Sequence, residues 1–266
     1  MKLAALSVAF GLLAGPVCVF ADDLDDAYDA LKQAQSSKDT AKIKTLAAAA
    51  HAAAKKYDAP APADTEKEAY EARVKYAKEV DAYSEYALYT GAIQTRSADL
   101  INALEQQNPK SQYLDMPEAI VIELDTALSR KQTDRAVTLA NRLIAAANKK
   151  APEGVSAADW DKAKDSYLGR GYYVAGVSAA ERNKYAEADR NLRSALPLIK
   201  GNNAMMGPAL FYLGVVNYNL ANMTANKAKM QEAAKFSEQA AAIPGPTQDQ
   251  AYKNSMAMKA AADKMR

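Results

Sequence analysis

Residues 169–202 have the clearest structural pattern of the chain and read GRGYYVAGVSAAERNKYAEADRNLRSALPLIKGN. It lacks the strict alternation of apolar and polar residues that marks a half-buried strand, and most of its residues are good helix formers. Small residues recur in it, among them Gly176, Ala188 and Ala195. Because small side chains let helices approach closely and larger ones fill the space around them, the stretch predicts two helices packed as a hairpin.

Counted from Gly169, these small residues stand at positions 8, 20 and 27 of a 34-residue unit. Larger residues stand at the intervening positions of the pattern. This arrangement resembles the tetratricopeptide repeat (TPR), a helical hairpin that stacks on its neighbours. The resemblance implies that the following residues pack the helices of the unit: Tyr172, Ala175, Gly176, Tyr185, Ala188, Leu192 and Ala195.

A second unit follows with the same order of residues, and the resemblance before residue 95 is only that of a generic helical hairpin. The second unit departs from the TPR pattern because Tyr218 stands one position late and Ser237 replaces a larger apolar residue. The segment from Asn222 to Lys229 predicts an enlarged turn between its helices. The resemblance implies packing roles in this unit for Leu213, Gly214, Ala233 and Ala240.

The rest of the chain is also rich in helix formers, and Pro and Gly residues divide it at intervals. Four segments resemble capping boxes, in which a cap side chain and the third helical residue satisfy each other's backbone amides. They are Thr65–Glu68, Asp115–Glu118, Ser156–Asp159 and Thr247–Gln250. Gly154, Gly201 and Gly245 are expected to end helices in the left-handed conformation. We expect eleven helices, at 23–36, 38–57, 64–92, 96–107, 116–130, 133–149, 156–182, 184–199, 204–221, 226–242 and 247–264.

Taken in pairs, these helices make about five antiparallel hairpins and a final single helix. A hairpin of roughly 35 to 45 residues cannot bury its apolar face alone and must stack on others, which predicts an all-α chain built as an α-solenoid. We expect the last helix to cap the stack with a polar outer face. The expected divisions are an N-terminal hairpin at 22–59, degenerate TPR-like hairpins at 60–150, and clear TPR hairpins with the capping helix at 151–266.

The first 21 residues resemble a secretory signal peptide. Lys2 precedes an apolar run from Leu3 to Leu13, and small residues surround a cleavage position after Ala21. A non-cleaved anchor is the alternative, whereas a lipoprotein is disfavoured because Pro16 and Val17 stand before the only Cys. The sequence thus predicts export to the periplasm or the exterior, with no transmembrane span after cleavage.

Composition disfavours several classes of function. The chain has 266 residues with 34 basic and 32 acidic side chains, and it lacks the basic excess that nucleic acid binding requires. It has one Cys and one His, too few for most Cys/His metal clusters. We therefore expect no nucleic acid partner, no metal and no cofactor.

No residue set predicts catalysis. His51 lies in an alanine block where Lys55 is the only polar neighbour one turn away, so we expect it to lack the positioned partner of a general base. The acidic run at Asp22–Asp26 lacks the Gly and Glu of a calcium loop. Gly169 and Gly201 lack the rest of a phosphate-binding loop. A pair of carboxylates from different helices remains an open alternative, and we expect a protein that is not an enzyme.

In TPR arrays the inner groove is lined by fixed positions of each first helix. Carried over to this chain, the resemblance implies an aromatic and aliphatic groove suited to an extended peptide or a partner helix. The groove has one Arg and lacks the Lys, Arg and Asn cluster that clamps a C-terminal carboxylate. The groove residues are Arg170, Tyr173 and Val177 in the first unit and Phe211, Val215 and Tyr218 in the second.

The chain has 15 Tyr residues, and three of them recur at helical spacing as Tyr83, Tyr86 and Tyr89. Tyr combines an apolar ring with a polar tip, which suits half-exposed interfaces. These rings fit either a partner surface or the packing between hairpins.

The resemblance extends to exported bacterial TPR proteins of unassigned activity, on the runs 147–154 and 196–201. It implies an exported, non-enzymatic scaffold that binds a protein or peptide. An assembly or secretion factor of the cell envelope and a helical enzyme acting on polysaccharides are the alternatives.

Overall fold

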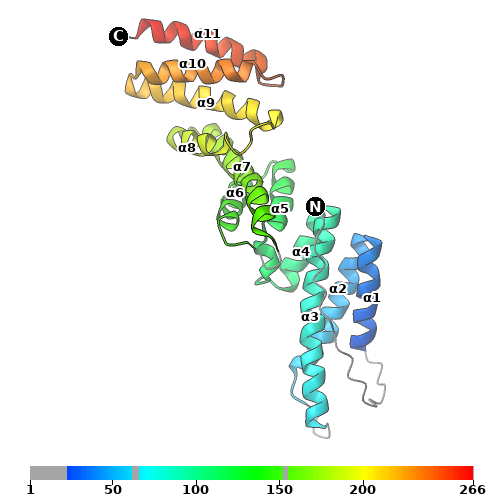
Figure 1. The fold of residues 1–266 in the computed structure, drawn as a ribbon. Helices are drawn as coiled ribbons and strands as arrows, with labels where there is room; N and C mark the ends of the chain where they lie inside the picture. The colour runs from blue at the N-terminus through cyan, green and yellow to red at the C-terminus, as the bar shows by residue number, and fades with distance from the viewer. Residues whose placement is uncertain (1–22, 62–65, 152–154, 266) are drawn as a thin grey trace. The chain divides into compact units, whose positions relative to one another are not determined.

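The computed structural model describes residues 23–61, 66–151 and 155–265, and the described part is helical with no strand (Figure 1). The prediction of an all-α chain is confirmed. Within these residues lie eleven α-helices: α1 (Asp23–Ser37), α2 (Thr40–Lys55), α3 (Lys67–Thr95), α4 (Ala98–Gln107), α5 (Pro117–Ser129), α6 (Thr133–Ala147), α7 (Ala157–Glu181), α8 (Tyr185–Ala195), α9 (Asn203–Thr224), α10 (Lys227–Ala241) and α11 (Gln248–Lys264). Two short 3₁₀ segments, η1 (Lys56–Asp58) and η2 (Gln112–Asp115), complete the set.

Most predicted helix ends lie within three residues of the observed ones, and two differences have clear causes. Helix α8 ends at Ala195, earlier than predicted, because Pro197 has no N–H to continue the helical hydrogen bonds. The enlarged turn predicted for Asn222–Lys229 is wrong. Helix α9 continues to Thr224, Ala225 takes a left-handed conformation with φ 49°, and the side chain of Asn226 accepts a hydrogen bond from the Lys229 amide at the start of α10.

Of the predicted helix N-caps, the structure shows a capping hydrogen bond at Ser156 and none at Thr247. The Ser156 side chain accepts from the Asp159 amide at 3.1 Å, so this cap is confirmed. Thr247 precedes α11 but makes no side-chain cap hydrogen bond. Helix α5 begins at Pro117, two residues after Asp115, and the Met116 carbonyl accepts a hydrogen bond from the Ile120 amide. Thr65 lies outside the described residues.

Among the described glycines, only Gly201 has a positive φ, of 87°, as predicted for a helix stop. The same prediction for Gly245 is wrong. Gly245 stands between Pro244 and Pro246, and a residue before proline is driven toward extended conformations. Gly154 lies outside the described residues.

The chain divides into two compact units, residues 1–126 and 127–266, with the division inside α5. In the first unit α1 packs on α2, α2 on α3 and α3 on α4, and α1 also contacts α3. Gly91 of α3 allows close packing here, because a Cβ atom at this position would lie 3.1 Å from Leu100 and 3.2 Å from Ile43. The largest fully buried side chains of this unit include Leu31, Ile43, Leu88, Leu100 and Leu104.

In the second unit each helix from α6 to α11 packs on the next one along the chain. Contacts also join α7 to α9 and α9 to α11, so some helices also contact the next helix but one along the chain. Helices α9, α10 and α11 lie side by side (Figure 1). None of the described helices is both long enough and apolar enough to cross a bilayer.

Candidate functional site

The second unit has a hollow of about 550 Å³ between the α5–α6 turn and the C-terminal part of α7. We call it the α7 hollow. Its apolar wall consists of Ala127, Leu128, Ala136, Tyr173, Val174 and Val177. Its polar residues are Lys131, Gln132, Thr133, Ser178 and Glu181.

Tyr173 and Val177 reach the hollow from successive turns of α7, because residues four apart share one face of a helix. Tyr173 is half-buried and packs against the cluster that contains Leu192 and Leu213. Burial, with a smaller contribution from the Glu181 carboxylate, raises the pKa of the Tyr173 phenol. Tyr173 therefore contacts the core of the unit and also lines the hollow.

Charged groups of opposite sign lie among the polar lining residues of the hollow. Lys131 takes a left-handed conformation with φ 56° in the turn after α5. Glu181 ends α7 and accepts a hydrogen bond of 3.0 Å from the hydroxyl of Tyr212. Burial, with the Glu181 hydrogen bond and charge, raises the pKa of Tyr212 to about 12. A bound segment would thus meet an apolar wall together with an ammonium and a carboxylate.

The structure brings together two of the six predicted groove residues, Tyr173 and Val177. Phe211 is half-buried and packs edge-on against Tyr212, with ring centroids 5.5 Å apart. Tyr218 is 37% exposed on α9. Phe211 and Tyr218, with Arg170 and Val215, are not among the residues that line the hollow.

The residues expected to pack the repeats lie at helix contacts. At Gly176 a Cβ atom would stand 2.7 Å from Leu192 Cγ, so α7 and α8 touch at this point. At Gly214 a Cβ atom would collide with the hydroxyl of Ser237. Tyr172 and Tyr185 are half-buried. The fully or nearly fully buried members of the set are Ala175, Ala188, Leu192, Ala195, Leu213, Ala233 and Ala240.

Ser237, the departure from the TPR pattern, has a role that the sequence did not reveal. It is fully buried, and its hydroxyl donates a hydrogen bond of 3.3 Å to the sulfur of Met258 on α11. A smaller residue is required here because Gly214 brings α9 close to α10. The Ser237 side chain is small enough for this space, and its buried hydroxyl is hydrogen-bonded to Met258.

His51 has a partner, contrary to expectation. Its Nδ1 lies 2.6 Å from Oδ1 of Asp81 on α3, and Lys55 Nζ lies 3.4 Å from the other oxygen of that carboxylate. The expectation was wrong because the partner is thirty residues away and reaches His51 only through the packing of α2 on α3. A carboxylate that orients an imidazole also occurs in structural contacts between helices, and we assign no catalysis to it.

The acidic run at the start of α1 forms ion pairs. Asp23 lies 2.6 Å from Lys56, and Asp25 lies 2.8 Å from Arg73. Across the described residues no group of three His, Cys, Asp or Glu side chains is arranged to hold a metal ion. These acids join α1 to the segments that pack on it.

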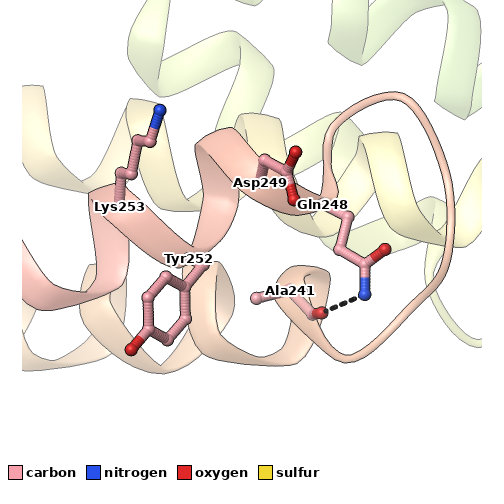
Figure 2. A pocket seen from close by; sticks show the side chains of 5 residues that line it. All are labelled: Ala241, Gln248, Asp249, Tyr252 and Lys253. Atoms are coloured by element: carbon pink, nitrogen blue, oxygen red, sulfur yellow. Dashed lines mark hydrogen bonds between the residues drawn. The ribbon is translucent and has the colours of Figure 1, made fainter.

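A second, smaller hollow of about 290 Å³ lies between the end of α10 and the start of α11. Figure 2 shows its lining residues, Ala241, Gln248, Asp249, Tyr252 and Lys253. Gln248 donates a hydrogen bond of 3.2 Å to the Ala241 carbonyl, and Tyr252 is 60% exposed. This shallow site has no apolar wall comparable to that of the α7 hollow.

Comparison of the chain with protein-family models, with curated proteins and with solved structures finds no match.

Proposed function

We propose that this protein is a non-enzymatic scaffold of TPR-like helical hairpins that binds a partner protein in the α7 hollow. The single observation that carries the proposal is the meeting of Tyr173 and Val177, two residues expected in the groove, within a hollow of about 550 Å³. The succession of contacts from α6 to α11 supports the solenoid part of the proposal.

The partner presents an amphipathic helix or a short extended segment. Its apolar side chains bury against Tyr173, Val174 and Val177, and this burial supplies most of the binding energy. A carboxylate of the partner pairs with Lys131 and a basic side chain pairs with Glu181. These two charge pairs lie near solvent, so they set orientation and association rate more than affinity.

The protein acts outside the cytoplasm in this proposal, because its first residues have the features of a signal peptide. Those residues lie outside the described part of the structure. Mass spectrometry of the protein from its native host tests this directly. A mature N-terminus at Asp22 supports export, and an intact Met1 in every recovered chain contradicts it.

Site-specific photo-crosslinking tests the binding surface. A photoreactive residue at Leu128, which is 42% exposed in the hollow, is compared with one at Tyr252, which is 60% exposed outside it. The captured partner is then purified and titrated against the native protein and against Tyr173→Ala with Val177→Asp. We expect crosslinks from position 128 only and a loss of affinity of at least about thirtyfold.

Equal crosslinking from both positions, or unchanged affinity in the double variant with native circular dichroism, would contradict the proposal. A partner that belongs to a cell-envelope complex would narrow the role to assembly or secretion. Hydrolysis of a cell-wall polysaccharide that disappears with one carboxylate would replace the scaffold with an enzyme.

A further inference from the structure

The rim of the α7 hollow bears a projecting apolar side chain next to an apolar recess. Leu128 is 42% exposed at the end of α5 and belongs to the lining of the hollow. In the same lining Val174 is buried, and Tyr173 and Val177 are half-buried on α7. A single surface of the second unit therefore presents both an apolar projection, Leu128, and a recess of about 550 Å³.

A charged group accompanies the projection, and another accompanies the recess. The Lys131 amide donates a hydrogen bond of 3.0 Å to the Leu128 carbonyl, so the two residues belong to one tight turn. Glu181 stands one helical turn beyond Val177, on the same face of α7. Its carboxylate accepts from the Tyr212 hydroxyl, but neither it nor the Lys131 ammonium makes an ion pair with another described residue.

Neighbouring charges leave these two groups open to a partner. Arg182, next to Glu181 in sequence, lies 2.6 Å from Asp134 instead. The chain as a whole has a formal net charge of +2, and a net charge so near zero produces little repulsion between two copies. Long-range electrostatics therefore allows two copies to approach, and the charges of the rim decide their orientation.

The projection and the recess complement each other, so the surface is complementary to a second copy of itself. In a contact with two-fold symmetry, every contact between two different residues is formed twice, once in each direction. When Leu128 of one copy enters the hollow of the other, Lys131 accompanies it toward Glu181 of that second copy. The symmetry then places the second Leu128 and the second Lys131 in the same way.

We propose that the protein forms a symmetric homodimer in which Leu128 of each copy is buried in the α7 hollow of the other. Leu128 packs on Tyr173 and Val177 of the other copy, and Lys131 pairs with its Glu181. The two apolar contacts supply most of the affinity, and the two ion pairs fix the orientation. This inference rests on the proposed function, because it names the protein that occupies the hollow.

Sedimentation equilibrium of the full mature chain, from about micromolar to about millimolar concentration, tests the dimer. We expect monomer to convert to dimer with no larger species, because a two-fold contact is closed. Leu128→Asp should weaken the dimer at least about thirtyfold, since it would bury a carboxylate in an apolar recess. Met223→Asp is the matched control, because Met223 is 73% exposed and lies outside the hollow, and it should leave the dimer unchanged.

Charge reversal tests the symmetry of the contact. Lys131→Glu would bring two carboxylates together at both ion-pair positions, and Glu181→Lys would bring two ammonium groups together. Each variant alone should dimerise about tenfold or more weakly. An equal mixture of the two should regain nearly native affinity, because both positions of the mixed dimer again join opposite charges. Lys253→Glu, outside the hollow, is the control and should have no effect.

A native chain that stays monomeric throughout, native affinity in Leu128→Asp with native circular dichroism, or no recovery in the mixture would each overturn the inference. The photo-crosslinking at Leu128 separates this failure from failure of the proposed function. A monomeric chain that crosslinks to a different protein from that position would overturn the homodimer and support the proposed function. A monomeric chain that crosslinks to nothing there would overturn both.

Discussion

The side-chain amide of Asn217 on α9 donates a hydrogen bond of 2.7 Å to the carboxylate of Asp189 on α8. Asn217 is fully buried, and its amide nitrogen also donates to the Leu213 carbonyl at 2.9 Å. Arg193 donates to Asp189 and to the amide oxygen of Asn217, and it reaches Glu232 of α10 at 2.9 Å. This polar network joins three successive helices, so it fixes their alignment as well as their contact.

Asn217→Leu should lower the free energy of unfolding by about 1–3 kcal/mol, because the partly buried Asp189 carboxylate loses a donor. Urea unfolding measures the difference. Asn219→Leu is the matched control, since the Asn219 amide bonds only to the Val215 carbonyl of its own helix. An equal loss in both variants would contradict the role of the network.

Gly176→Ala should destabilise the protein by about 1–3 kcal/mol, because the added methyl group meets Leu192 at 2.7 Å and must push α8 away from α7. Gly245→Ala is the control, because nothing lies within 4 Å of a Cβ atom there. Thermal unfolding of the two variants gives the comparison. A native melting temperature for Gly176→Ala would show that the two helices do not depend on this contact.

His51 and Asp81 should stabilise the packing of α2 on α3 jointly. A double-mutant cycle with His51→Ala and Asp81→Ala should give a coupling free energy of about 0.5–1.5 kcal/mol, because the pair lies partly in solvent. The cycle removes the contributions of Lys55 and of lost packing. A coupling of zero would mean that the 2.6 Å contact does not contribute to stability.

Alkaline pH should destabilise the first unit through Tyr83. Burial, with the neighbouring Tyr28 and Tyr86, raises the pKa of Tyr83 to about 12, whereas an unfolded tyrosine has a pKa of about 10. The unfolded state therefore loses this proton first. The stability that Tyr83 contributes is complete below pH ~10 and decreases as the pH rises to about 12.

Phenolate absorbance followed during the pH titration measures this effect. Tyr83→Phe should reduce the absorbance component that ionises near pH 12, to which Tyr212 also contributes, and should reduce the dependence of unfolding free energy on pH above pH ~10. An unchanged titration curve in that variant would contradict the assignment. Tyr252→Phe, an exposed tyrosine, serves as the control.

The helices could be predicted because their signals are local. Helix-forming composition, Pro and Gly breaks and the Ser156 cap lie within a few residues of the elements they define. The turn after α9 was mispredicted because the repeat pattern suggested an insertion, whereas the left-handed Ala225 and the Asn226 cap close the turn in two residues. A cap signal at Asn226 was present in the sequence and could have located it.

The candidate site could be predicted only in part, because its other half comes from a different helix pair. Tyr173 and Val177 follow from the spacing within α7, but their neighbours Leu128 and Lys131 depend on how the α5–α6 turn packs against α7. The same limit explains why Asp81 was not recognised as the partner of His51. No periodicity within one helix contains the information for such contacts between helices.

Hydrogen exchange with and without the captured partner tests whether the α7 hollow is the binding surface. We expect slower exchange of backbone amides in residues 127–136 and 173–181, which border the α7 hollow, and unchanged exchange in α10 and α11. Protection confined to residues 241–253, or to no part of the α7 hollow, would contradict the proposal that this hollow is the binding surface.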